Sequence, residues 1–211
     1  MELFNYFRSS ASWRVRIALA LKGLDYDYRS VHLVRNEQHA EPFATASVSH
    51  LVPLLKLDEG SLLTQSLAII EYLDETHPEP PLLPAEPVAR AQVRALAQDI
   101  ACEIHPLNNL RVLRYLVREL QIDEDAKKRW YRHWVESGLA VVEQRLRTTA
   151  GRFCFGERPG LADCVLVPQV FNAQRFDCKL DALPEVMRVH ANCMAHEAFA
   201  GTQPSECPDA E

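Results

Sequence analysis

The chain has 211 residues and carries 29 acidic and 23 basic side chains, which give a formal net charge of −6 at pH 7. Because the basic residues are scattered along an acidic chain, nucleic acid is excluded as an expected partner. No apolar stretch is long enough to span a bilayer and no basic-then-apolar leader opens the chain, so no membrane partner is expected. A cytoplasmic location is expected from the dispersed cysteines. The 6 cysteines form no CxxC pair, which predicts reduced thiols and no metal site.

A short apolar strand is predicted at residues 3–7, directly before a helix start that is rich in hydroxyl groups. Ser9, Ser10 and Ser12 precede the apolar part of this helix. Serine oxygens accept hydrogen bonds from the first N–H groups of a helix, and the same end of the helix attracts anions. With Arg8 beside it, this turn is expected to present hydroxyls, N–H groups and a cation to a negative group. Local pattern alone also allows a simple capped helix.

The next segments continue a small α/β domain. Gly23 is the expected end of the first helix, and residues 25–33 are predicted to form a second strand, which completes a strand–helix–strand unit. A weak helix or loop is expected at 37–46. Residues 51–57 are predicted to form a third strand that has proline at its entry, and a cis Val52–Pro53 bond is predicted there.

A hairpin turn at residues 58–60 leads into a fourth short strand, 61–64. Gln65 and Ser66 then open a second amphipathic helix over residues 67–75. Five prolines fall between Pro78 and Pro87, a density that neither a helix nor a central strand accepts. The sequence therefore predicts a first domain over residues 1–77 and a stiff proline-rich linker over 78–87.

Beyond the linker, residues 88–211 are predicted to form an all-helical domain. Its first helix covers 89–120 and is expected to bend near Pro106. A helix over 123–148 is expected to turn Trp130, Trp134 and Leu139 inward. The remaining predictions are helices over 160–176 and 183–196 and a loose, polar tail over the last ten residues.

This layout resembles that of the cytosolic glutathione transferases, in which a thioredoxin-like α/β N-terminal domain precedes an all-α C-terminal domain. Residues 8–19 resemble the signature of the zeta class. Val52–Pro53 is similar to the family's cis-proline turn, and Gln65–Ser66 is similar to the pair that holds the γ-glutamyl carboxylate of glutathione. These motifs occur in the family's order and the resemblance covers essentially the whole chain, including segments 99–113 and 160–176 of the helical half.

The chain also departs from the family pattern. Ala11 stands where many zeta-class members have a cysteine, so a role for that thiol is absent. Ser47–Val48 replaces the usual Asn–Pro ahead of the cis-proline turn. Gly160 stands where most members have a capping Ser or Thr, although the partner Asp163 is kept, and a modest loss of stability is all that this change implies.

The resemblance implies a glutathione-dependent cis–trans isomerase of aromatic amino-acid catabolism, with possible glutathione transferase activity. It would convert maleylacetoacetate to fumarylacetoacetate by thiolate addition, bond rotation and elimination, and glutathione would be a regenerated cofactor. Maleylpyruvate is an alternative substrate, because it presents the same maleyl end. A glutathione transferase-like conjugating or binding protein without isomerase activity is a second hypothesis. The resemblance also implies a homodimer.

The expected site combines thiolate activation with carboxylate binding. Ser10, with Ser9 in reserve, is expected to donate to the glutathione sulfur and so stabilise its anion. Arg8, Arg111 and Arg175 are expected to bind a small dicarboxylate substrate, since guanidinium groups bind carboxylates in a bidentate way. Arg8 is also expected to be catalytic, because it would stabilise negative charge as the reaction proceeds. The other expected glutathione contacts are Gln38, Val52, Pro53, Gln65, Ser66, His105 and Asn109.

Overall fold

The computed structural model describes residues 1–211, which divide into two units. One unit contains Met1–Leu82 together with Ala195–Glu211, and the other contains Leu83–Met194. The division after Leu82 falls inside the proline-rich stretch 78–87. The sequence assigned residues 195–211 to the helical domain, whereas in the structure they group with the first unit.

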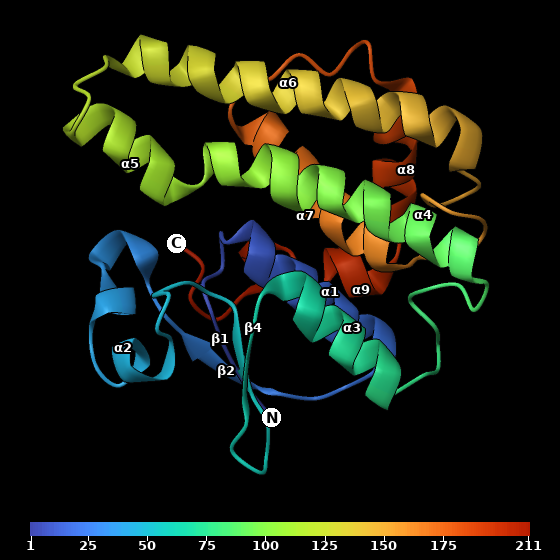
Figure 1. The fold of residues 1–211 in the computed structure, drawn as a ribbon, viewed down its shortest axis with the longest axis horizontal. Helices are drawn as coiled ribbons and strands as arrows, with labels where there is room; N and C mark the ends of the chain where they lie inside the picture. The colour runs from blue at the N-terminus through green and yellow to red at the C-terminus, as the bar shows by residue number, and fades with distance from the viewer. The chain divides into compact units, whose positions relative to one another are not determined.

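The first unit contains a mixed four-stranded sheet in the order β2-β1-β3-β4. Its strands are β1 (Glu2–Asn5), β2 (Asp27–Ser30), β3 (Leu54–Lys56) and β4 (Leu62–Thr64) (Figure 1). β1 pairs with β2 in parallel, as a strand–helix–strand crossover requires, while β3 pairs with β1 and β4 in the antiparallel sense. β2 is therefore an edge strand, and β1 lies in the interior of the sheet.

The two faces of the sheet bury alternate residues of the same strands. Phe4 lies opposite Leu54, and Leu3 lies opposite Leu55. Successive side chains of a strand point to opposite faces, so each pair contributes to a different core. Leu54 belongs to a buried cluster with Phe43, and Phe4 packs against that cluster. Leu3 and Leu55 are fully buried on the other side.

The helices of this unit are α1 (Ser10–Lys22), α2 (Phe43–Ala46), α3 (Ser66–Thr76) and α9 (Glu197–Ala200). α1 packs against α3 and also against α9 (Figure 1). α1 ends at Gly23, whose left-handed φ of 64° matches the predicted glycine stop. The predicted cis Val52–Pro53 bond is confirmed, and it lies directly before β3.

The second unit is helical throughout. Its helices are α4 (Pro87–Gln98), α5 (Leu110–Arg118), α6 (Glu124–Thr149), α7 (Leu161–Arg175) and α8 (Pro184–Met194). The helix expected over 89–120 is interrupted where a bend was predicted, by a π-helical turn at Asp99–Ile104 and a 3-10 turn at His105–Asn108. α7 packs against α4 and α8. None of the helices is long and apolar enough to cross a bilayer.

One detail of α6 differs from the sequence prediction. The helix has the predicted extent, and Asp123 caps it by accepting from the Ala126 N–H at 2.6 Å. However, Trp130 and Trp134 are only half-buried. The buried apolar stripe is offset by one residue and consists of Tyr131, Val135, Leu139, Val142 and Leu146. Of the three residues predicted to face inward, only Leu139 belongs to this stripe, and Trp130 and Trp134 lie at its border.

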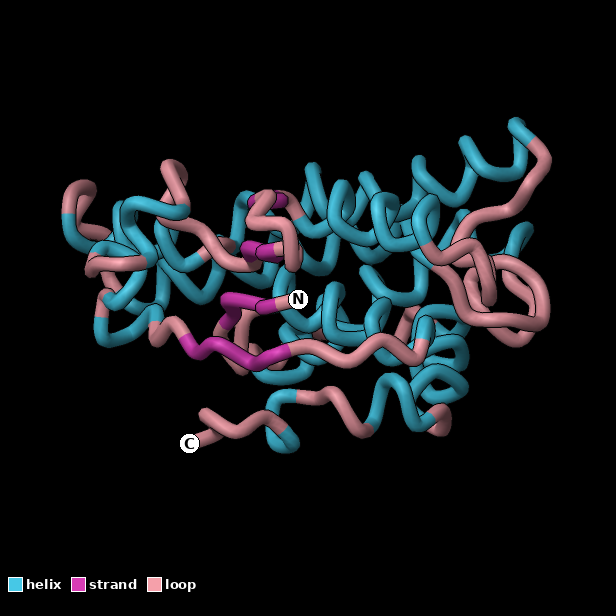
Figure 2. Tube along the Cα trace, turned by 90° about the horizontal axis from the view of Figure 1, so that it is seen from below, coloured by secondary structure: helices cyan, strands magenta, loops and turns pink.

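The prediction of a loose C-terminal tail is wrong. Within the last ten residues a 3-10 turn forms at Pro204–Glu206, and side chains near the end of the chain bond to other parts of the first unit. Arg35 forms an ion pair with Glu211, and the same carboxylate lies 3.3 Å from His32 Nε2. Figure 2 shows this segment running beside the edge of the sheet to the point marked C. The polar, proline-bearing composition that suggested disorder supplies the side chains that anchor the tail.

Candidate active site

The turn between β1 and α1 places hydroxyl groups at the positive end of a helix. Ser9 is the N-cap of α1, where its Oγ accepts from the Ser12 N–H at 3.2 Å and its own N–H donates to the Tyr6 carbonyl at 2.9 Å. Ser10 is the first helical residue and is buried. The two hydroxyls therefore differ in their local duties, because only the Ser9 oxygen accepts the capping hydrogen bond.

Arg8 lies half-buried beside these serines. Its Nε and Nη2 donate to the Tyr6 hydroxyl at 3.2 and 2.8 Å, and its guanidinium carbon lies 4.9 Å from the centroid of the Phe7 ring. These contacts orient the guanidinium, while the N–H groups on Nη1 can still donate to a carboxylate. The turn thus combines a directed cation with the hydroxyls of α1.

The cis-proline turn offers an open stretch of backbone. Val52 and Pro53 are both buried, and Val52 packs in one cluster with Tyr6 and Phe7. No hydrogen bond within the chain engages the backbone N–H or C=O of Val52. Both groups can therefore pair with an extended peptide in the manner of an added strand.

Gln65 and Ser66 lie at the start of α3. Gln65 has φ 69° and ψ 114°, a conformation that residues other than glycine rarely adopt, and its side chain is exposed. Ser66 is the first residue of the helix and is buried. Strain of this kind concentrates at ligand-binding positions. The N-terminus of α3 is a favourable place for a carboxylate.

Arg14, which the sequence analysis did not single out, contacts one of the residues expected to bind glutathione. Arg14 lies on α1, and its Nη1 donates to Ser66 Oγ at 3.2 Å. Arg14 is 2% exposed, so it places a buried positive charge at the start of α3. Its position one helical turn after Ser10 was the available sequence signal, since both residues then project from the same side of α1.

Gln38 belongs to a 3-10 turn, Glu37–His39, on the segment before α2. Its side chain is buried, and its Oε1 has no hydrogen-bond partner within the chain. Its carbonyl lies 3.1 Å from His50 Nδ1, which ties this turn to the loop that leads to the cis-proline. A buried acceptor of this kind suits a ligand that brings an N–H donor.

The second unit holds the remaining predicted residues. Asn109 is the N-cap of α5, where its Oδ1 accepts from the Arg111 N–H at 3.0 Å, and its Nδ2 lies 3.5 Å from His105 Nε2. The structure thus brings these three residues together around the start of α5. Arg175 ends α7, where its exposed guanidinium lies 5.0 Å from the Phe176 ring centroid. The convergence of Arg8, Arg111 and Arg175 on one ligand stays a prediction.

Comparison with known proteins identifies the class of protein that this fold and site define. Residues 3–81 match the family model of the glutathione S-transferase N-terminal domain, and residues 124–196 match that of the C-terminal domain. The chain belongs to the glutathione S-transferase family, and the resemblance stated from its motifs is confirmed. Its fold is the predicted thioredoxin-like domain with a helical domain.

The relatives narrow this membership to the zeta class. A probable maleylacetoacetate isomerase of Vibrio cholerae is 50% identical, over 99% of this chain and 97% of that protein. A holo structure of maleylpyruvate isomerase, described as a bacterial zeta-class enzyme, is 43% identical with a TM-score of 0.97 and full coverage of both chains. A maleylacetoacetate isomerase structure from Methylobacterium extorquens AM1, with malonate and glutathione bound, is 37% identical with a TM-score of 0.96, again over both full chains.

Proposed function

We propose that this chain is a glutathione-dependent cis–trans isomerase that converts maleylacetoacetate to fumarylacetoacetate. The observation that carries the proposal is the β1–α1 turn, which combines the Ser10 hydroxyl, the N-terminus of α1 and the guanidinium of Arg8. A site that binds only a hydrophobic electrophile has no use for a directed guanidinium beside the thiol position. A small dicarboxylate does, because Arg pairs with carboxylates through parallel N–H bonds.

The residues of the first unit fit glutathione. The open backbone of Val52 suits a peptide-like ligand, the start of α3 with Gln65 and Ser66 suits its γ-glutamyl carboxylate, and the unpartnered Oε1 of Gln38 suits one of its N–H groups. When bound, glutathione supplies a thiol whose anion can add to the maleyl double bond and leave again. His105 and Asn109 are proposed as further contacts from the second unit.

The chain itself has to keep that thiol ionised. A free thiol has a pKa of about 8.5, so most of it is protonated at neutral pH. A hydroxyl donor and the positive end of a helix both favour the anion, and each lowers the pKa of a nearby thiol. We assign the donor to Ser10, the buried first residue of α1, and the capping role to Ser9, whose Oγ accepts from the Ser12 N–H.

The arginines are assigned to the substrate. Arg8 orients one carboxylate beside the reacting carbon atoms and stabilises the negative charge that develops on the substrate. Arg111 and Arg175 are proposed to bind the other end of the molecule. The malonate in the Methylobacterium extorquens relative is a small dicarboxylate, and it supports this class of substrate here.

Maleylpyruvate is the second candidate substrate. The similarity to a maleylpyruvate isomerase structure, with 43% identity and a TM-score of 0.97, supports it, whereas the relative at 50% identity supports maleylacetoacetate. Both compounds present the same maleyl carboxylate to Arg8, so the remainder of the substrate has to distinguish them. Rates measured on both compounds with one enzyme preparation decide between them.

The proposals for assembly and location are supported by the family to which the chain belongs. We propose a homodimer, which sedimentation at micromolar concentration tests and which a monomer would contradict. A cytoplasmic location is supported by the cysteines, all of which are free thiols.

Arg8 offers a direct test of the proposal. Arg8→Ala should lower kcat/KM for maleylacetoacetate about ten- to a hundredfold, since a hydrogen bond to a charged group contributes about 1.5–3 kcal/mol. The bound thiol should keep nearly its wild-type pKa. Arg29→Ala is the matched control, because Arg29 is an exposed arginine of the same unit that pairs only with acidic surface residues. Equal kinetics in the two variants would remove Arg8 from the site.

A further inference from the structure

The residue directly before Arg8 is held by side chains at both of its backbone groups. The Phe7 carbonyl accepts from Arg16 Nη2 at 3.0 Å, and the Phe7 N–H donates to Asp209 Oδ2 at 3.3 Å. Neither bond belongs to a helix or to the sheet. The backbone at the entrance of the β1–α1 turn is therefore positioned by one residue of α1 and by one residue close to the C-terminus.

Asp209 is itself fixed by the edge strand. The Tyr28 hydroxyl donates to its Oδ1, and the Ser30 hydroxyl donates to its Oδ2 at 2.9 Å. Burial and the hydrogen bond to Asp209 raise the pKa of the Tyr28 hydroxyl well above its usual value, so Tyr28 remains a donor at neutral pH. With the Phe7 N–H, three donors converge on one carboxylate, which links β2, the β1–α1 turn and the tail.

The rest of the tail reinforces this link. The Thr202 carbonyl accepts from Arg16 Nε at 3.1 Å, and the Thr202 hydroxyl accepts from Trp13 Nε1 at 3.1 Å, so the first half of α1 is bonded to the tail. The Cys207 side chain is buried in the cluster that contains Phe7 and Val52. Through Cys207, the tail therefore packs in the same core cluster as the β1–α1 turn and the cis-proline turn, which are both assigned to glutathione.

We propose that Asp209 is a positioning residue for the isomerase site. By fixing the Phe7 N–H, it sets the backbone from which Arg8 and the serines of α1 project. The bonds from Tyr28 and Ser30 of β2 would be enough to anchor the tail. The third bond, which Asp209 accepts from the Phe7 N–H, connects the tail to the β1–α1 turn. The inference rests on the proposed function, because it assumes that this turn holds the substrate and the thiol.

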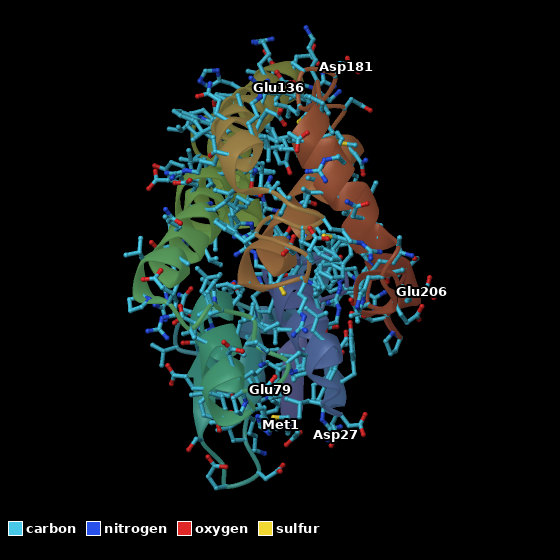
Figure 3. The ribbon with its side chains drawn as sticks, turned by 90° about the vertical axis from the view of Figure 1, so that its right-hand side faces the viewer. Met1, Asp27, Glu79, Glu136, Asp181 and Glu206 are labelled. Carbon is cyan, nitrogen blue, oxygen red and sulfur yellow. The ribbon has the colours of Figure 1, made fainter.

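Three variants test the inference. Asp209→Ala removes all three acceptor contacts, and Asp209→Asn keeps the shape and one acceptor oxygen. Glu206→Ala is the matched control, because this exposed carboxylate of the same segment bonds only to Ser205 and points outward (Figure 3). Hydrogen exchange at the Phe7 amide, kcat and KM for the maleyl substrate, and thermal unfolding are measured for each variant.

Asp209→Ala is expected to speed exchange at the Phe7 amide at least about tenfold, since that N–H loses its partner. It is expected to lower kcat/KM about ten- to a hundredfold, because a small misplacement of catalytic groups has effects of this size. Asp209→Asn should lie between wild type and Asp209→Ala. If Asp209→Ala does not fold, Asp209→Asn and Tyr28→Phe give the same comparison, because each weakens the link while retaining most of its contacts.

Three outcomes overturn the inference. The first is exchange and kinetics in Asp209→Ala that match Glu206→Ala. The second is a lower melting temperature with an unchanged Phe7 amide and unchanged kinetics, which would make the contact purely structural. The third is unchanged kinetics in Asp209→Ala while Arg8→Ala is impaired. If Arg8→Ala and Ser10→Ala are also unimpaired while the Phe7 amide is loosened, the proposed function fails instead.

Discussion

Ser9 and Ser10 are adjacent hydroxyls to which the structure gives different duties, and paired alanine variants should separate them. Ser9→Ala removes the acceptor of the Ser12 N–H and should destabilise the fold by about 1 kcal/mol, the usual effect of losing an N-cap. For a chain of this size, that loss corresponds to a fall in melting temperature of about 2–4 °C. Ser10 is not the cap, so Ser10→Ala should leave the melting temperature closer to wild type.

The expected effects on the thiol are reversed. If the Ser10 hydroxyl donates to the thiolate, its loss removes a hydrogen bond to a charged group, worth about 1.5–3 kcal/mol. At about 1.4 kcal/mol for each pKa unit, the pKa of bound glutathione should rise by about one to two units. The anion would then form only at higher pH, so the acidic limb of the pH–rate profile should shift to higher pH values. The loss of turnover should therefore be greatest at low pH.

Ultraviolet titration of the bound thiolate, with thermal unfolding of the same variants, reads both effects. A wild-type thiol pKa in Ser10→Ala together with a raised pKa in Ser9→Ala would assign activation to Ser9. An unchanged pKa in both variants would mean that the end of α1 and its backbone N–H groups carry the activation. Either result would refute the assignment of the hydroxyl of Ser10.

Three further substitutions test the structure around the site. Gln65→Gly should relieve the backbone strain at φ 69° and so raise the free energy of unfolding by about 1 kcal/mol. The affinity for glutathione, measured by calorimetry, should fall because the side chain is lost. An unchanged affinity would remove Gln65 from the site. Asp163→Asn replaces a carboxylate that accepts from two backbone N–H groups at 2.9 Å, and it should lower the free energy of unfolding by about 1.5–3 kcal/mol. Thermal unfolding measures this loss. An equal loss of stability in the exposed control Asp181→Asn would contradict the prediction. Gly138→Ala would bring its Cβ to 2.4 Å from Ile104 Cγ1 and should destabilise the helical unit by about 1–3 kcal/mol, whereas a wild-type melting temperature would show that Ile104 moves aside freely.

The features that the sequence predicted are those with local causes. The end of α1 follows from Gly23, and the start of α6 follows from Asp123, because caps act on the backbone within a few residues. The cis-proline turn and the Gln65–Ser66 pair were identified through the family motifs. The interruption near Pro106 follows from the missing N–H of proline.

The features that the sequence did not predict depend on residues far apart in the chain. Composition indicated a loose tail, but Asp209 is held by Phe7, Tyr28 and Ser30, which lie about 180 to 200 residues earlier. No periodicity or cap marks such a contact. The bond from Arg14 to Ser66 is of the same kind, because it exists only once α1 and α3 are packed together.

The central claim is that the chain isomerises a maleyl compound while glutathione is regenerated. The most direct test follows maleylacetoacetate, fumarylacetoacetate and free thiol together, with substrate in large excess over glutathione. We expect complete conversion to the trans product, an unchanged concentration of free glutathione, and no conversion when glutathione is omitted. Loss of one free thiol for each substrate consumed would identify a conjugating transferase, and conversion without glutathione would contradict the mechanism.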